Sequence, residues 1–231
     1  MPTRGAAASG GGYQRYCSHE RVCQMSRPTR IPLFPLSGAI LFPRSHLPLH
    51  IFEDRYRAMV EDAMAGPGRI AMIQPADDKV PGLYQVGCVG ELVGVEELDD
   101  GRYNIMLLGS QRFRLIGEAT SGTPYRQADV DLDAFNDDDP EPLSSIQRAE
   151  VEREARRFGD ALSLAVDWDA VGRLDDEMLV NAIAQVAPFD AGAKQALLEE
   201  VTLAGRADLV VQLMQFQRLA PGGADMTQTV Q

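Results

Sequence analysis

Two lysines, Lys79 and Lys194, supply the side-chain amines that could act as a general base or hold a phosphate. A phosphate-binding loop needs the pattern G-x-x-x-x-G-K-[ST], and neither lysine stands in it. Lys79 follows Asp77 and Asp78, whose negative charges keep an amine protonated. Lys194 is expected in the first turn of a helix, on the surface. We therefore exclude an ATP site of this type and expect no Ser–Lys hydrolase.

Any Ser–His–Asp or Cys–His site would need His46 or His50, and both histidines lie in an apolar segment. We expect partly buried imidazoles with satisfied hydrogen bonds, and no HExxH spacing is present. The polar cluster that follows contains Glu53 and Arg57, whose i,i+4 spacing favours an ion pair that stabilises a helix. A binding surface is the alternative interpretation of this cluster. No catalytic residue is expected.

The three cysteines, Cys17, Cys23 and Cys88, are an odd number in a chain that begins without an apolar signal segment. This usage indicates a reducing cytoplasm. Cys17, His19 and Cys23 are close enough in sequence to suggest metal ligands, but a fourth ligand is missing. Cys88 lies in an apolar strand pattern and is expected to be a small buried hydrophobe. We expect neither a metal nor another cofactor.

The chain carries a net charge of −12, with a pI of about 4.7. This charge opposes binding to nucleic acid and to anionic membranes, because both need clustered Lys and Arg. No run of about 18 apolar residues predicts a membrane span. Residues 133–142 read DAFNDDDPEP, which lacks the spacing of a calcium loop and is expected to be a solvated linker.

The elements that position these residues change from β to α along the chain. Short strands are expected over Ile31–Leu36 and Ala39–Phe42, joined by a turn at Ser37-Gly38, with a helix over Phe52–Ala65. Further strands are expected over Arg69–Gln74, Val86–Val95, Tyr103–Leu108, Arg112–Ile116 and Tyr125–Leu132. The glycines at 87, 90 and 94 predict bulges or sharp curvature, as in a barrel.

Four helices are expected in the second half. Three begin at capping residues Ser144, Asp175 and Asp190, and Gln147 completes a capping box with Ser144. The first helix is expected to carry its apolar face as far as Ala165, and the last covers about Ala207–Leu219. The fold class is therefore α+β, with a β domain over residues 28–135 and a helical bundle over 143–220. Residues 1–27 are expected to be a disordered or non-native extension, with Met25 as a natural start, and residues 221–231 a disordered tail.

Several collinear motifs point to one family. Residues 32–64 read PLFPLSGAILFPRSHLPLHIFEDRYRAMVEDAM, residues 86–115 read VGCVGELVGVEELDDGRYNIMLLGSQRFRL, and KQALLE at 194–199 is followed by Arg206. These motifs resemble the N-terminal substrate-binding domain of Lon proteases (peptidase S16 homology) over about Ile31 to Leu219. Arg44 departs from the glycine that this family usually has. The resemblance implies a PUA-like β pseudo-barrel followed by a C-terminal α-helical bundle.

The resemblance also implies a function, namely a stand-alone, non-catalytic module that binds unfolded or partner polypeptide and lacks ATPase and protease domains. We expect Arg44, Tyr56, Leu83 and Tyr84, around the barrel mouth and the Pro75–Tyr84 loop, to contact this polypeptide. The alternatives are RNA binding by a PUA-like protein and an enzyme of unknown small-molecule chemistry. The identity of the partner and the oligomeric state stay open.

Overall fold

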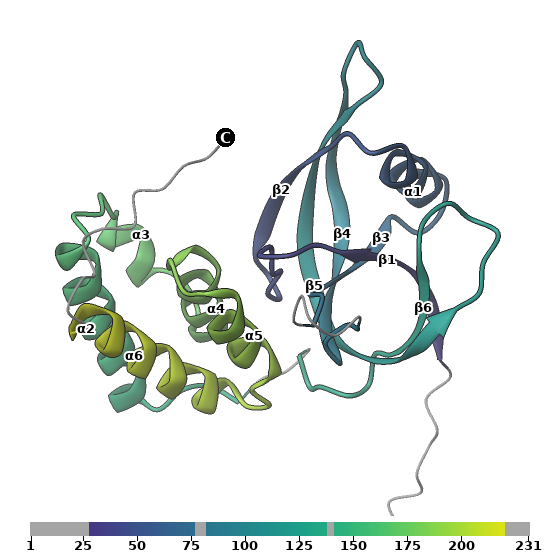
Figure 1. Cartoon of the computed structure of the whole chain (residues 1–231). Coiled ribbons are helices and arrows are strands. Elements are labelled where there is room, and N and C mark those ends of the chain that lie inside the picture. Colours follow the sequence, from purple (N-terminus) through teal and green to yellow (C-terminus); the bar gives the residue numbers. More distant parts are fainter. Residues whose placement is uncertain (1–27, 77–81, 138–140, 220–231) are drawn as a thin grey trace, which may run out of the picture.

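The computed structural model describes residues 28–76, 82–137 and 141–219 as a strand-rich part and a group of helices (Figure 1). The strands are β1 (Thr29–Pro35), β2 (His46–Ile51), β3 (Arg69–Ile73), β4 (Val86–Glu97), β5 (Tyr103–Ala119) and β6 (Gln127–Asp131). The helices are α1 (Asp54–Ala65), α2 (Ser145–Ala161), α3 (Trp168–Gly172), α4 (Asp176–Val186), α5 (Ala191–Glu199) and α6 (Leu203–Leu219). The expected α+β arrangement, a pseudo-barrel followed by a helical bundle, is confirmed.

Five strands close into a ring in the order β5–β4–β3–β1–β6, because β6 pairs with both β1 and β5. The sixth strand, β2, lies outside the ring and pairs with the first half of β5, from Tyr103 to Leu108. Two separate strands were predicted over 103–116, but β5 is continuous. Gly109 does not turn the chain, because it pairs with Gly90 of β4 and bonds to Arg44 and Ser45, while Ser110 is the extra residue of a bulge.

The barrel interior is filled by apolar side chains from every strand of the ring. They are Ile31, Leu33, Ala71, Ile73, Val89, Phe113, Ala128 and Val130. Gly87 is needed here because a Cβ atom would collide with the carbonyl oxygen of Met72 and the ring of Phe113. The predicted irregularities at Gly90 and Gly94 are confirmed, since the β4–β5 register shifts between Val89 and Gly90 and between Leu92 and Gly94.

The prediction of a strand over Ala39–Phe42 is wrong. Ile40, Leu41 and Phe42 are buried, but as a coil that packs against the helices. Gln185 of α4 takes the place of a neighbouring strand: its amide nitrogen donates to the Ile40 carbonyl at 2.8 Å, and its oxygen accepts from the Phe42 N–H at 3.3 Å. The apolar pattern of residues 39–42 therefore predicted correctly that the segment is buried, and wrongly that it pairs as a strand.

Helix α1 buries the predicted face, including Met59, Val60 and Ala63, against the outside of the barrel. The predicted ion pair between Glu53 and Arg57 is wrong. Arg57 instead pairs with Asp54 at 3.2 Å, and Glu53 pairs with Arg55 at 2.7 Å. Glu53 precedes the helix in extended backbone, so the i,i+4 geometry of helical residues does not apply to it.

The caps predicted for the bundle are confirmed. Ser144 and Gln147 form a reciprocal capping box, and Asp175 and Asp190 accept from the N–H groups of Met178 and Ala193. Helix α2 ends at Ala161, short of its predicted face, and a five-residue helix, α3, follows that was not predicted. Helix α6 begins at Leu203, one turn before the prediction. No helix of the described ranges is long and apolar enough to cross a membrane.

The contact of Gly109 with the buried 39–45 segment gives a stability prediction. A Cβ atom on residue 109 would overlap the carbonyl oxygen of Phe42, so Gly109→Ala is expected to lower the free energy of unfolding by about 2 kcal/mol. Gly117→Ala on the same strand is the matched control, because nothing lies within 4 Å of its Cβ position. Urea denaturation measures both, and similar stabilities of the two variants would contradict the packing described here.

Candidate functional site

A shallow hollow of about 520 Å³ lies on the outer face of the β2–β5–β4 sheet. Its floor is a row of three neighbouring residues, Pro48 on β2, Met106 on β5 and Gly94 on β4. Residues paired across strands point to the same face, so the missing side chain of Gly94 leaves the space that Met106 and Pro48 border. The hollow is open to solvent and mostly apolar.

A row of polar side chains bounds the hollow towards the hairpin tip. His50 Nδ1 and Asn104 Oδ1 are 2.8 Å apart, and the Asn104 amide donates to Glu96 at 2.8 Å. The Asn104 oxygen can only accept, so the proton lies on His50 Nδ1 and Nε2 is left to accept from Arg102 at 3.2 Å. The Arg102 hydrogen bond in turn lowers the pKa of Asp100. The row therefore fixes each polar group in one orientation.

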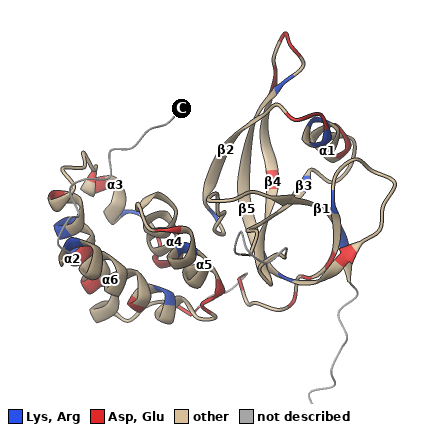
Figure 2. Ribbon diagram, in the orientation of Figure 1, with Lys and Arg blue, Asp and Glu red and all other residues tan. Residues whose placement is uncertain are grey.

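The apolar surface extends beyond the hollow. Phe52, directly after β2, is 62% exposed, and its ring stacks beside that of His50 with centroids 6.3 Å apart. Val95 of β4 is also exposed, but it pairs with Ile105 and so points to the opposite face of the arm. Acidic residues lie at the tip of the β4–β5 hairpin and along α1, with basic residues among them (Figure 2). The arm formed by β2, β4 and β5 thus presents an apolar hollow with an exposed aromatic ring beside it and charged residues at its end.

The structure places the four sequence-predicted contact residues apart from this hollow and on different elements. Tyr56 of α1 is buried, with its ring 4.4 Å from that of Phe34 and the Arg55 guanidinium 4.5 Å above it. Leu83 and Tyr84 are half-buried. Residues 77–81, which include Lys79, lie outside the described residues.

Arg44 has a positive φ of 60° and points towards the bundle, where it pairs with Glu177 at 2.9 Å and Asp175 at 3.1 Å. A glycine at this position would adopt the same backbone conformation without strain. Here the arginine side chain is occupied by a contact between the barrel and α4.

The side chains considered for catalysis are buried or engaged in structural hydrogen bonds. Lys194 is half-buried rather than on the surface, and its Nζ donates to the Gln185 carbonyl at 2.7 Å, while burial lowers its pKa. Cys88 is fully buried as predicted, which raises the pKa of its thiol. Within the described ranges no three His, Cys, Asp or Glu side chains gather as metal ligands. Cys17, His19 and Cys23 lie outside those ranges.

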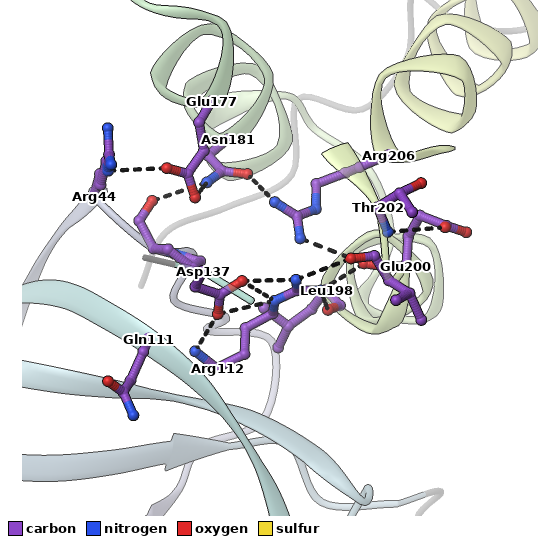
Figure 3. A network of polar contacts seen from close by, with 12 residues as sticks. Arg44, Gln111, Arg112, Asp137, Glu177, Asn181, Leu198, Glu200, Thr202 and Arg206 are labelled. Carbon is purple, nitrogen blue, oxygen red and sulfur yellow. Dashed lines mark hydrogen bonds and ion pairs between the residues drawn. The ribbon is translucent and has the colours of Figure 1, made fainter. Parts of the chain in front are cut away.

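Sequence reasoning missed a buried ion pair between the two parts of the molecule (Figure 3). Arg112 of β5 is 2% exposed and pairs with Asp137 at 2.7 Å; the backbone N–H of residue 112 also donates to this carboxylate at 2.6 Å. The same guanidinium donates to the carbonyls of Leu198 and Glu200 at the end of α5. The prediction of a solvated linker over residues 133–142 is therefore wrong for Asp137.

A second buried arginine continues the network across the bundle. Arg206 of α6 donates to Asn181 of α4 at 2.8 Å and to the Leu197 carbonyl at 3.1 Å. Burial and the nearby charge of Arg112 lower the pKa of Arg206 to about 10, so it stays charged at neutral pH. Asn181 then donates to the Pro43 carbonyl at 3.0 Å, which returns the network to the barrel side.

Only a partial signal for this junction was present in the sequence. Arg112 precedes Phe113 in a segment predicted as a strand, where the neighbouring cysteine and phenylalanine positions are core. Adjacent strand residues point to opposite faces, so the sequence alone favours an exposed Arg112, and only its pairing with buried Cys88 shows that this face is covered. The acidic run that follows β6 supplies several candidates, but sequence alone does not select Asp137 among them.

A five-stranded barrel with an outer strand, joined to a helical bundle and bearing an open apolar surface, defines a two-part α+β domain. The family model for the "ATP-dependent protease La (LON) substrate-binding domain" matches residues 30–215. The chain therefore belongs to the Lon substrate-binding domain family.

The relatives agree with this assignment. The chain is 27% identical over 204 residues to "Lon protease 2" of Myxococcus xanthus, covering 83% of this chain and 24% of that protein. It is 30% identical over 203 residues to "Lon protease 2" of Sorangium cellulosum, covering 80% and 24%. The chain thus spans about a quarter of the length of the curated relatives it matches.

Two solved structures share the fold. One is a Lon N-terminal domain protein from Xanthomonas campestris, with a TM-score of 0.62 at 21% identity over 80% of this chain and 98% of that one. The other is the N-terminal domain of Mycobacterium avium complex Lon protease, with a TM-score of 0.62 at 18% identity over 81% and 98%.

The junction gives a second stability prediction. Asp137→Asn leaves the buried Arg112 cation without a charged partner and is expected to lower the free energy of unfolding by about 3 kcal/mol. The matched control is Asp129→Asn, which breaks the exposed pair with Arg30 and is expected to cost less than about 1 kcal/mol. Urea denaturation of both variants measures the difference, and equal losses would refute a special role for the buried pair.

Proposed function

We propose that this domain binds polypeptide chains without cleaving them, and that the hollow between Pro48, Met106 and Gly94 is a contact site. The observation that carries the proposal is an open apolar hollow next to an ordered polar row on the same sheet face. Small-molecule sites enclose most of their ligand, whereas a shallow hollow suits a side chain of a long polymer that continues past it. Membership of a substrate-binding domain family supports the same interpretation.

The chemistry of the surface favours apolar and basic segments of polypeptide. Phe52 and the hollow offer apolar contact area, and His50, Asn104 and Glu96 offer fixed hydrogen-bonding groups beside it. The net charge of −12 opposes an RNA partner, because phosphates would be repelled.

A non-catalytic role is part of the proposal and rests on the surroundings of the reactive groups. The Lys194 amine is engaged with a backbone carbonyl, and burial raises the pKa of the Cys88 thiol. Leu83 and Tyr84 are proposed as a separate contact region, because the side chains of both are half-exposed. The proposed compartment is a reducing one, the cytoplasm.

Filling the hollow tests the proposal. A Cβ atom on residue 94 would lie 3.4 Å from Met106 Cβ, an ordinary contact, so Gly94→Leu is expected to fold and to occupy the space. Binding of reduced and alkylated lysozyme, an unfolded basic polypeptide, should weaken about tenfold, as expected when one buried apolar contact is lost. Fluorescence anisotropy of labelled lysozyme measures the dissociation constant.

Gly117→Leu is the matched control, since it adds the same side chain to β5 in open space away from the hollow. It should bind as the unaltered chain does. Equal affinity of the Gly94→Leu and Gly117→Leu variants would reject the hollow as the contact site, and absence of any lysozyme binding would reject the function itself.

A further inference from the structure

The outer half of β4 has an unpaired backbone edge. Strand β3 pairs with β4 from Cys88 to Glu91, and the last bond on that side joins the Leu92 N–H to the Gly68 carbonyl. Beyond it, residues 94–97 pair with β5 on one side, Val93 is the extra residue of a bulge, and no described strand lies on the other side. This half of the β4–β5 hairpin projects beyond the barrel (Figure 1). All five residues are exposed.

The register shows which backbone groups face outwards. The Leu98 N–H bonds to the Arg102 carbonyl at the turn, and antiparallel pairs alternate between bonded and non-bonded. Glu96 and Gly94 are therefore the residues that bond β5. Val95 and Glu97 direct their N–H and C=O groups away from β5, and the register shift at Val93 marks where this free segment begins. The edge thus offers donors and acceptors at the spacing of another strand.

The opposite edge of the same sheet, on β2, is protected against strand addition. By the same alternation, His46, Pro48 and His50 of β2 face away from β5, and Pro48 has no N–H to offer. Proline on an edge strand is a device that prevents strand addition. The β4 segment contains no proline, so the two edges differ in their capacity to pair.

The free edge is acidic. Glu97 of β4 and Glu61 of α1 both lie near the Tyr103 hydroxyl, where their charges add to the effect of burial in raising its pKa. Glu96 lines the hollow on the other face of the strand, where its carboxylate accepts from Asn104. In the described ranges none of these three carboxylates forms a salt bridge. Arg57 also acts on the Tyr103 hydroxyl, but it pairs with Asp54 at 3.2 Å, so a strand that approaches this edge meets more negative than positive charge.

We propose that the β4 edge at residues 93–97 binds an extended basic polypeptide segment by strand addition. This inference rests on the proposed function and names the conformation and charge of its substrate. The added strand bonds to Val95 and Glu97, its alternate side chains reach the hollow at Gly94, and its Lys or Arg residues meet Glu61 and Glu97. A second copy of this chain is disfavoured at the edge, because two such edges would bring like charges together.

The test uses the full chain and a fluorescein-labelled eight-residue peptide of alternating Val and Lys. Val95→Pro removes an outward N–H and no bond to β5, and should weaken peptide binding at least about tenfold, since it loses a backbone hydrogen bond and disturbs its neighbours. His46→Pro is the matched control on the protected β2 edge, and this variant should bind the peptide as the unaltered chain does. The same peptide N-methylated at every second residue should fail to bind, because one edge of it can no longer donate.

Two measurements make the result independent of the folding of any one variant. Amide hydrogen exchange of the unaltered chain should show the Val95 and Glu97 amides protected by the Val-Lys peptide. Glu97→Lys should weaken binding of the Val-Lys peptide and strengthen binding of a Val-Glu peptide. Together with the loss caused by N-methylation, these results would support strand addition.

Several outcomes would overturn it. If the N-methylated peptide binds equally, or if the Val-Lys peptide fails to bind while alkylated lysozyme binds, strand addition is wrong and the proposed function stands. If neither binds, both proposals fail together. A concentration-dependent dimer that Val95→Pro abolishes would assign the edge to a second copy and also overturn the inference.

Discussion

The buried pair between Arg112 and Asp137 is the interaction on which the arrangement of this molecule depends. The last carbonyls of a helix have no partners within it, and the end of α5 would bury them without compensation. Arg112 reaches from β5 to the carbonyls of Leu198, Glu200 and Val201, and Arg206 reaches two carbonyls of the same end. The barrel thus supplies the cap of a bundle helix, and Asp137 neutralises the cation that does so. Neither part of the chain satisfies its polar groups without the other.

This dependence extends to the proposed contact site through the coil at residues 39–45. Gln185 and Asn181 of α4 hold the backbone of this coil at Ile40, Phe42 and Pro43. The coil in turn lies against Gly109, whose N–H bonds to the Ser45 carbonyl one residue before β2 begins. The start of β2, and with it the hollow at Pro48, is therefore fixed from two sides. Strand β5 of the ring pairs along β2, and the bundle holds the coil that leads into it.

Much of the fold was predictable because local chemistry determined it. Ser144, Asp175 and Asp190 cap helices through their own side chains, and Gly101 makes the predicted hairpin turn with a φ of 76°. Two of the failures share one physical cause, which is partners distant in sequence. The coil at 39–42 is buried by a helix about 140 residues later, and Asp137 is buried by Arg112 on another element. The hollow depends on the register of three strands. The sequence could therefore predict a strand irregularity at Gly94, but not that Gly94 leaves a space beside Met106.

Strand β5 runs without interruption from the hairpin to the junction. It exchanges neighbours along its length: residues 103–108 lie between β2 and β4, β4 alone continues to Arg114, and β6 pairs from Arg114 to Ala119. Met106 at the hollow and Arg112 at the junction are six positions apart on it, about 20 Å of strand backbone that includes the bulge at Ser110. β5 therefore links the two parts of the molecule directly. A polypeptide at the proposed contact site would lie on the same strand that reaches the helices through Arg112.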